Sequence, residues 1–254
     1  MNPASTPFYL DWTFWAATIA VLALILLQLP PVRVLFRRTA VSLRPYDRLN
    51  VTHWLGNPNV NLHIQLMNTG GRTVKVSALA LELTRDDGVI VTLPAQTFSR
   101  ADGTAGSLLF TRLTLELDKE WANFVTFFSQ FTVPDERLSK RLTRDLRLDI
   151  DAKLLAQTQA SGQKQLVEAA AAQVDPLITF FQNHNFWRPG EYAARLMAIC
   201  EPSRASVAKS FRFTLFESDV QDLDERTSRY KYGFGVYLTD TAQTEVYPRI
   251  KDVA

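Results

Sequence analysis

The sequence has few residues that commonly bind metals or form crosslinks. It contains one cysteine, Cys200, and three histidines in 254 residues. A single cysteine cannot form an intrachain disulfide or a multi-cysteine metal site. None of the histidines forms an HExxH or HxH pattern, so no metal site and no cofactor are predicted. Cys200 lies in the apolar run ARLMAIC and is interpreted as a small buried side chain.

Local catalytic motifs are also missing. The chain contains no GxSxG, GxGxxG or GxxxxGK[ST] pattern. The carboxylates Asp145, Asp149 and Asp151 alternate with basic residues, which is typical of a solvated helix surface rather than an acid–base pair. A net charge of +2 gives no general attraction to nucleic acid. We therefore expect a non-catalytic protein, although an enzyme with dispersed catalytic residues would leave no local motif.

One uncharged run of 21 residues covers 12–32. A helix of about 20 apolar residues can cross a bilayer core. The aromatic residues Tyr9, Trp12 and Trp15 crowd one end of the run, as in an interfacial belt. The run predicts a transmembrane helix over 12–32 after an N-terminal tail over 1–11. A cleaved signal peptide is disfavoured because no Lys or Arg precedes the run.

Basic residues follow this run in a linker over 33–49. Arg33, Arg37 and Arg38 come first, and the positive-inside rule then predicts an outside N-terminus and a cytoplasmic main domain. The same arginines would meet lipid headgroups, which makes the bilayer a predicted partner. A periplasmic or extracellular main domain is the alternative.

Period-two patterns after the linker predict strands. In NVNLHIQLMN, Val60, Leu62, Ile64 and Leu66 share one face and polar side chains share the other. The next run slips in phase between Val76 and Leu79, which indicates a bulge near Ser77. Strands at about ten-residue spacing favour the first part of an antiparallel β-sandwich over 50–118.

The periodicity changes over 119–187, which is predicted to be a helical insertion within the sandwich, with a separate helical domain as the alternative. Both DKEWANFVTFFSQF and the following DERLSKRLTRDLRLDIDAKLLAQTQ are interpreted as helices. Asp175 and Pro176 predict the start of a further short helix. Strand character returns over 188–254, which is predicted to complete the sandwich and end in a hairpin.

The stretch GEYAARLMAI resembles the penultimate strand of immunoglobulin-like and fibronectin-type sandwiches. The resemblance implies that Tyr192 packs at a corner and that its hydroxyl bonds to the backbone. It implies an all-β antiparallel fold and no particular function.

Aromatic residues in the tail provide a candidate partner surface. These are Tyr230, Tyr232, Phe234 and Tyr237. Packing on the sheet or on a neighbouring helix is the alternative for them. The sequence predicts a membrane-anchored, non-catalytic interaction module with protein partners and no nucleic acid ligand. The alternatives are an envelope-binding sandwich that recognises components such as glycan, and a subunit of a larger membrane complex.

Overall fold

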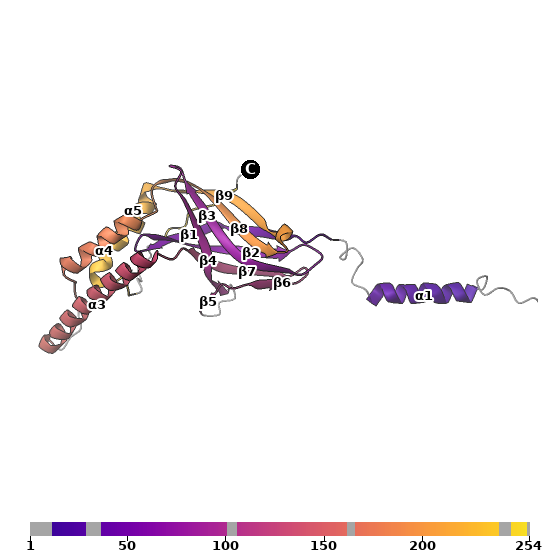
Figure 1. Cartoon of the computed structure of the whole chain (residues 1–254), viewed down its shortest axis with the longest axis horizontal. Coiled ribbons are helices and arrows are strands. Elements are labelled where there is room, and N and C mark those ends of the chain that lie inside the picture. The colour runs from indigo at the N-terminus through magenta and orange to yellow at the C-terminus, as the bar shows by residue number, and fades with distance from the viewer. Residues whose placement is uncertain (1–11, 29–36, 101–105, 162–165, 239–244, 253–254) are drawn as a thin grey trace, which may run out of the picture.

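The computed structural model describes residues 12–28, 37–100, 106–161, 166–238 and 245–252 (Figure 1). The strands are β1 (Val41–Trp54), β2 (Asn57–Asn68), β3 (Val74–Arg85), β4 (Ile90–Arg100), β5 (Ser107–Leu109), β6 (Leu113–Leu115), β7 (Glu120–Phe128), β8 (Gly190–Glu201), β9 (Val207–Leu215) and β10 (Lys251–Asp252). The helices are α1 (Trp12–Gln28), α3 (Val133–Ser161), α4 (Ala171–His184) and α5 (Glu217–Glu225), with 3₁₀ turns η2 (Ser203–Ala205) and η3 (Arg226–Tyr232). Figure 1 shows α3, α4 and α5 gathered at one end of the sheet.

The strands form one continuous sheet in the order β1-β2-β7-β4-β3-β8-β9-β10, with β5 beside β4 and β6 beside β3. The first half of β4 pairs with β3 and its second half pairs with β7. Because one strand belongs to both halves, there are not two separate sheets packed face to face. The prediction of an all-β sandwich with a helical insertion is therefore wrong in its architecture.

The C-terminal segment connects the two outer edges of this sheet. Val246 and Val51 exchange backbone hydrogen bonds of 3.1 and 2.8 Å, which attaches the segment to β1. A few residues later, β10 pairs with β9. Residues 246–252 therefore form a narrow bridge between the first strand and the last long strand.

The core lies inside this curved sheet. Alternation places one side of each long strand inward, and the inward side chains are almost fully buried. Examples are Leu62, Ile64, Leu81, Leu196, Phe211 and Phe213. A second, smaller cluster lies among α3, α4 and η3, with Leu146, Leu177, Phe181 and Tyr230 at its centre.

The sequence predicted the β3 bulge correctly but misplaced two helices. The register between β3 and β8 shifts between Val76 and Ala78, which confirms the bulge near Ser77. The expected helix over DKEWANFVTFFSQF is wrong, because residues 120–128 form β7, with Val125 and Phe127 buried. The chain over 171–184 is one helix with Pro176 inside it, rather than a helix that starts at Pro176.

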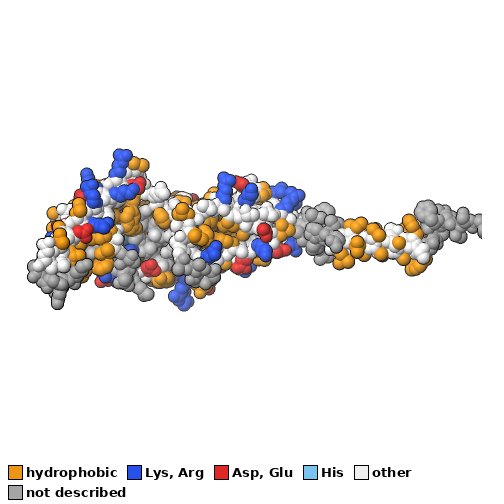
Figure 2. Space-filling view, turned by 90° about the horizontal axis from the view of Figure 1, so that it is seen from below, with side chains coloured by type: hydrophobic (Ala, Val, Ile, Leu, Met, Phe, Trp, Pro, Cys, Tyr) orange, Lys and Arg blue, Asp and Glu red, His pale blue; other side chains and the backbone are white. Residues whose placement is uncertain are grey.

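The predicted transmembrane helix over 12–32 is also wrong. None of the helices formed by the described residues combines the length and the apolar character that a membrane crossing requires. The helix α1 has 17 residues. At 1.5 Å per residue this is about 26 Å, shorter than a hydrocarbon core of ~30 Å. The single-pass localisation and the cytoplasmic placement of the main domain, both inferred from that span, lose their support. Figure 2 shows the apolar side chains of α1 uncovered on this side of the molecule.

Candidate functional site

The outer face of β1, β2 and β7 carries amide and aromatic side chains. In β2, Asn59, Asn61 and His63 point outward, because their neighbours Val60 and Leu62 are fully buried. Antiparallel pairing sets Asn59 opposite Phe128, Asn61 opposite Thr126, and His63 opposite Phe124. Polar and aromatic groups from two strands distant in the sequence therefore share one surface.

Three rings form a row across this surface. The centroids of His63 and Phe124 are 4.9 Å apart, and those of His63 and Tyr46 are 6.2 Å apart, both in edge-on geometry. Phe124 is 51% exposed and Tyr46 is 58% exposed. Large apolar rings that remain exposed on a sheet face mark a candidate binding surface.

A small pocket of about 200 Å³ lies at one end of the same face, lined by Trp54, Asn57, Asn59 and Phe128. The indole of Trp54 is 41% exposed and packs 5.5 Å from the ring of Phe131. The amide of Asn57 donates to the carbonyl oxygen of Ser129 at 2.7 Å, which fixes its orientation. The side-chain oxygen of Asn59 has no hydrogen-bond partner among the described residues.

We call this surface the aromatic–amide face. It comprises Tyr46, Trp54, Asn57, Asn59, Asn61, His63, Phe124 and Phe128. Each amide can donate and accept hydrogen bonds, and the rings supply flat apolar area. The set contains no carboxylate, lysine or arginine, so it is suited to a ligand with many hydroxyl groups and little charge.

The tail residues predicted as a partner surface are not brought together as one exposed patch. Tyr230 is fully buried in the smaller core cluster, and this burial raises the pKa of its hydroxyl. Tyr232 donates its hydroxyl to Glu168 at 2.6 Å. Phe234 lies beneath the guanidinium of Arg229, and Tyr237 lies beside that of Arg147; both rings are half-buried. These side chains mainly join η3 and the residues after it to the helical end of the molecule.

The residues predicted to lie at a membrane interface belong to two separate parts of the structure, α1 and the approach to β1. Trp12 and Trp15 are exposed on α1. Arg37 and Arg38 are exposed at the approach to β1, where Arg37 forms an ion pair of 3.5 Å with Asp118. Tyr9 and Arg33 lie outside the described residues.

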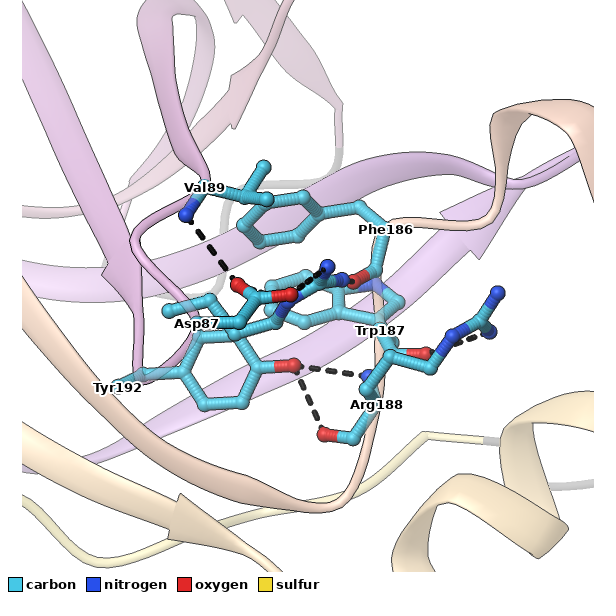
Figure 3. Close-up of polar contacts among 7 residues, drawn as sticks. Asp87, Val89, Phe186, Trp187, Arg188 and Tyr192 are labelled. Carbon is cyan, nitrogen blue, oxygen red and sulfur yellow. Dashed lines mark hydrogen bonds and ion pairs between the residues drawn. The ribbon is translucent and has the colours of Figure 1, made fainter.

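A polar cluster clamps the β3–β4 turn to the start of β8 (Figure 3). The hydroxyl of Tyr192 donates to the carbonyl oxygen of Arg188 and accepts from its backbone N–H, each at 2.8 Å. Arg85 binds Asp87 and also donates to the carbonyl oxygen of Phe186 at 2.8 Å. The guanidinium of Arg85 holds the pKa of Asp87 low, at about 2. Every group has a structural partner, so we assign the cluster to stability.

The side chain of His53 is polar and buried, and it lies apart from this cluster. Its ring lies 4.9 Å from that of Phe181, and burial lowers its pKa to about 4. Cys200 is buried and its pKa is raised by that burial, the reverse of what an activated thiolate requires. Within the described ranges, no group of three or more His, Cys, Asp or Glu side chains is placed to hold a metal ion.

Comparison with known proteins adds no functional assignment. No family model matches the sequence, and no curated protein matches it. The sequence pattern indicated the polar side of β2, but not its aromatic partners. Phe124 and Phe128 were missed because their segment was interpreted as a helix. No periodicity in the sequence reveals this strand, because its aromatic residues fall on both of its sides.

Proposed function

We propose that this protein is a non-catalytic binding module whose aromatic–amide face holds a hydroxyl-rich ligand, namely a glycan. The observation that carries the proposal is the row Tyr46–His63–Phe124 beside the amides of β2. An aromatic face packs against the C–H surface of a sugar ring, while amides bind its hydroxyl groups. This combination of flat apolar area and a few polar groups is common in ligand sites.

The rigidity of the surface supports this function. The outward residues stand on β2 and β7, which pair without a break from Asn59 to Met67. The inward residues of the same strands are fully buried in the core. A site on such strands binds without the entropy cost of ordering a loop.

A glycan array tests the proposal directly, with the full chain as the probe. We expect binding to a subset of oligosaccharides, and about tenfold weaker binding for Phe124→Ala and Tyr46→Ala, given the stacking energy that an exposed ring supplies. Leu155→Ala is the control, because Leu155 is exposed on α3, away from this face. Absence of binding across the array, or equal binding by Phe124→Ala and the wild type, would contradict the proposal.

A polypeptide partner is the second candidate function. It is favoured by Leu148 and Leu155, which lie seven residues apart on α3 and are 60% and 62% exposed. Residues at this spacing share one side of a helix and could pack against a partner helix. Substitution of both by Lys would abolish such a complex in cross-linking experiments and leave glycan binding intact.

A further inference from the structure

A second cavity, of about 540 Å³, lies where the C-terminal segment connects β1 to β9. Its walls come from β1, the end of β9, the start of α5 and residues 245–251. Three of its lining residues are cationic, namely Arg48, Arg249 and Lys251. None of these residues belongs to the aromatic–amide face.

Arg48 and Arg249 lie directly opposite each other in an antiparallel bridge. The residues that flank them on each side make the backbone hydrogen bonds, at 3.3 and 2.8 Å, so the two arginines form the non-hydrogen-bonded pair. Side chains approach most closely at such a pair, and like charges there repel each other. Both side chains are exposed, and an anion between them would relieve this repulsion.

The three cations of the cavity form no ion pair with any side chain in the described part of the chain. Among residues 37–100, 106–161, 166–238 and 245–252, none forms a side-chain hydrogen bond with Arg48, Arg249 or Lys251. The cavity also contains two carboxylates, so its lining side chains carry one net positive charge, and both carboxylates accept hydrogen bonds from neutral donors. Asp219 accepts the backbone N–H of Phe216 at 2.8 Å, and Glu245 accepts from Asn50 at 2.6 Å and from Tyr247 at 2.7 Å.

Apolar area lies beside these cations. Phe216 and Tyr247 both line the cavity, and both rings are largely exposed. Guanidinium groups bind carboxylate and phosphate oxygens in a bidentate manner. The cavity therefore offers an oxyanion site and, next to it, aromatic surface for the rest of an organic molecule.

We propose that this cavity binds a small organic acid, whose carboxylate or phosphate group lies between Arg48 and Arg249 and whose apolar part lies on Phe216 and Tyr247. The inference does not depend on glycan binding by the aromatic–amide face. The inference rests on three observations: the positive charge of the cavity, the two opposed arginines and the adjacent aromatic rings.

Three probes of similar shape test the site by NMR titration of the full chain at constant ionic strength: phenyl phosphate, benzoate and the uncharged phenol. We expect saturable shifts in the backbone amides of residues 48–51, 246–247 and 249–250 with at least one of the two anions, and none with phenol. Shifts with phenyl phosphate alone identify a phosphate ligand, and shifts with benzoate alone identify a carboxylate ligand.

Matched arginine variants complete the test. Arg48→Gln and Arg249→Gln should each weaken anion binding about tenfold, the loss expected for a charge-assisted hydrogen bond. Arg44→Gln is the control, because Arg44 is exposed on the same strand but does not line this cavity. The proposal is overturned if neither anion gives saturable shifts, if phenol binds equally well, or if Arg44→Gln weakens binding as much as Arg48→Gln.

Discussion

The ring nitrogen Nε2 of His53 lies 2.9 Å from the carbonyl oxygen of Leu223, although the two residues are 170 positions apart. The other ring nitrogen, Nδ1, accepts the backbone N–H of Gly56 at 3.3 Å. Nε2 must then carry the proton and donate to Leu223, so the imidazole is neutral with both nitrogens occupied. A second proton at Nδ1 would face the Gly56 N–H and break that contact.

The pH dependence of stability follows from this geometry. Burial is the largest cause that lowers the pKa of His53, to about 4 from 6.5, and the nearby Arg226 adds to it. Between these values the unfolded chain binds a proton that the folded chain does not, so the free energy of unfolding falls as the pH falls. Urea titrations from pH 7 to pH 4 should show a loss of up to about 3 kcal/mol from this group.

His53→Gln removes the titrating group and should flatten the stability profile between pH 6.5 and 4 by that amount. Asn61→Gln, which changes a side chain without a titrating group on the outer face of β2, serves as the control and should keep the slope of the wild type. If the His53→Gln profile runs parallel to that of the wild type, His53 is not the group responsible.

Gly56, in the turn between β1 and β2, should not tolerate a side chain. Its φ is +88°, and a Cβ there would lie 2.5 Å from the carbonyl oxygen of Phe181. Gly88 has a similar φ of +84° but has open space around it. We expect Gly88→Ala to cost about 1 kcal/mol from backbone strain alone, and Gly56→Ala to cost clearly more because the two backbones must separate. Chemical denaturation of both variants measures the difference, and equal costs would refute the packing argument.

The clamp formed by Tyr192 should contribute measurably to stability. Tyr192→Phe keeps the ring that stacks on Phe213 at 5.0 Å but removes the hydroxyl that bonds both backbone groups of Arg188. We expect the free energy of unfolding to fall by about 1–3 kcal/mol. Tyr247→Phe removes a hydroxyl whose hydrogen bonds, to Glu245 and from Asn50, are exposed to solvent, and should change stability by less than about 0.5 kcal/mol.

The repulsion between Arg48 and Arg249 predicts a stabilising substitution. Without a bound anion, Arg48→Gln should raise the free energy of unfolding by about 0.5 kcal/mol at low salt. The gain should shrink as added salt screens the charges. Thermal unfolding at two salt concentrations measures it, and a variant less stable than the wild type at low salt would show that the arginines do not repel each other.

The sequence predicted correctly those strands and helices whose apolar residues repeat at a regular spacing. β2 alternates regularly and β3 alternates on each side of its bulge, while α3 repeats Leu138, Leu142, Leu146 and Ile150 at helical spacing, with Leu146 and Ile150 buried. The backbone bond of the Tyr192 hydroxyl also agrees with what the immunoglobulin-like resemblance implied, although the sheet arrangement differs from a sandwich.

The remaining features depend on contacts between distant segments. β7 has aromatic residues on both sides, so its period was ambiguous until β2 and β4 paired with it. The bridge formed by residues 246–252 is defined by its pairing with β1 and β9, two strands far from it in the sequence. The aromatic–amide face combines Tyr46, His63 and Phe124, which no short motif could have connected.

The most direct test of the proposed function is to map where an oligosaccharide from the array binds. In a backbone NMR titration, the account predicts the largest shifts at Asn61, His63 and Phe124, and loss of these shifts in Phe124→Ala. Shifts confined to α3 and α4, with Phe124→Ala behaving as the wild type, would contradict it.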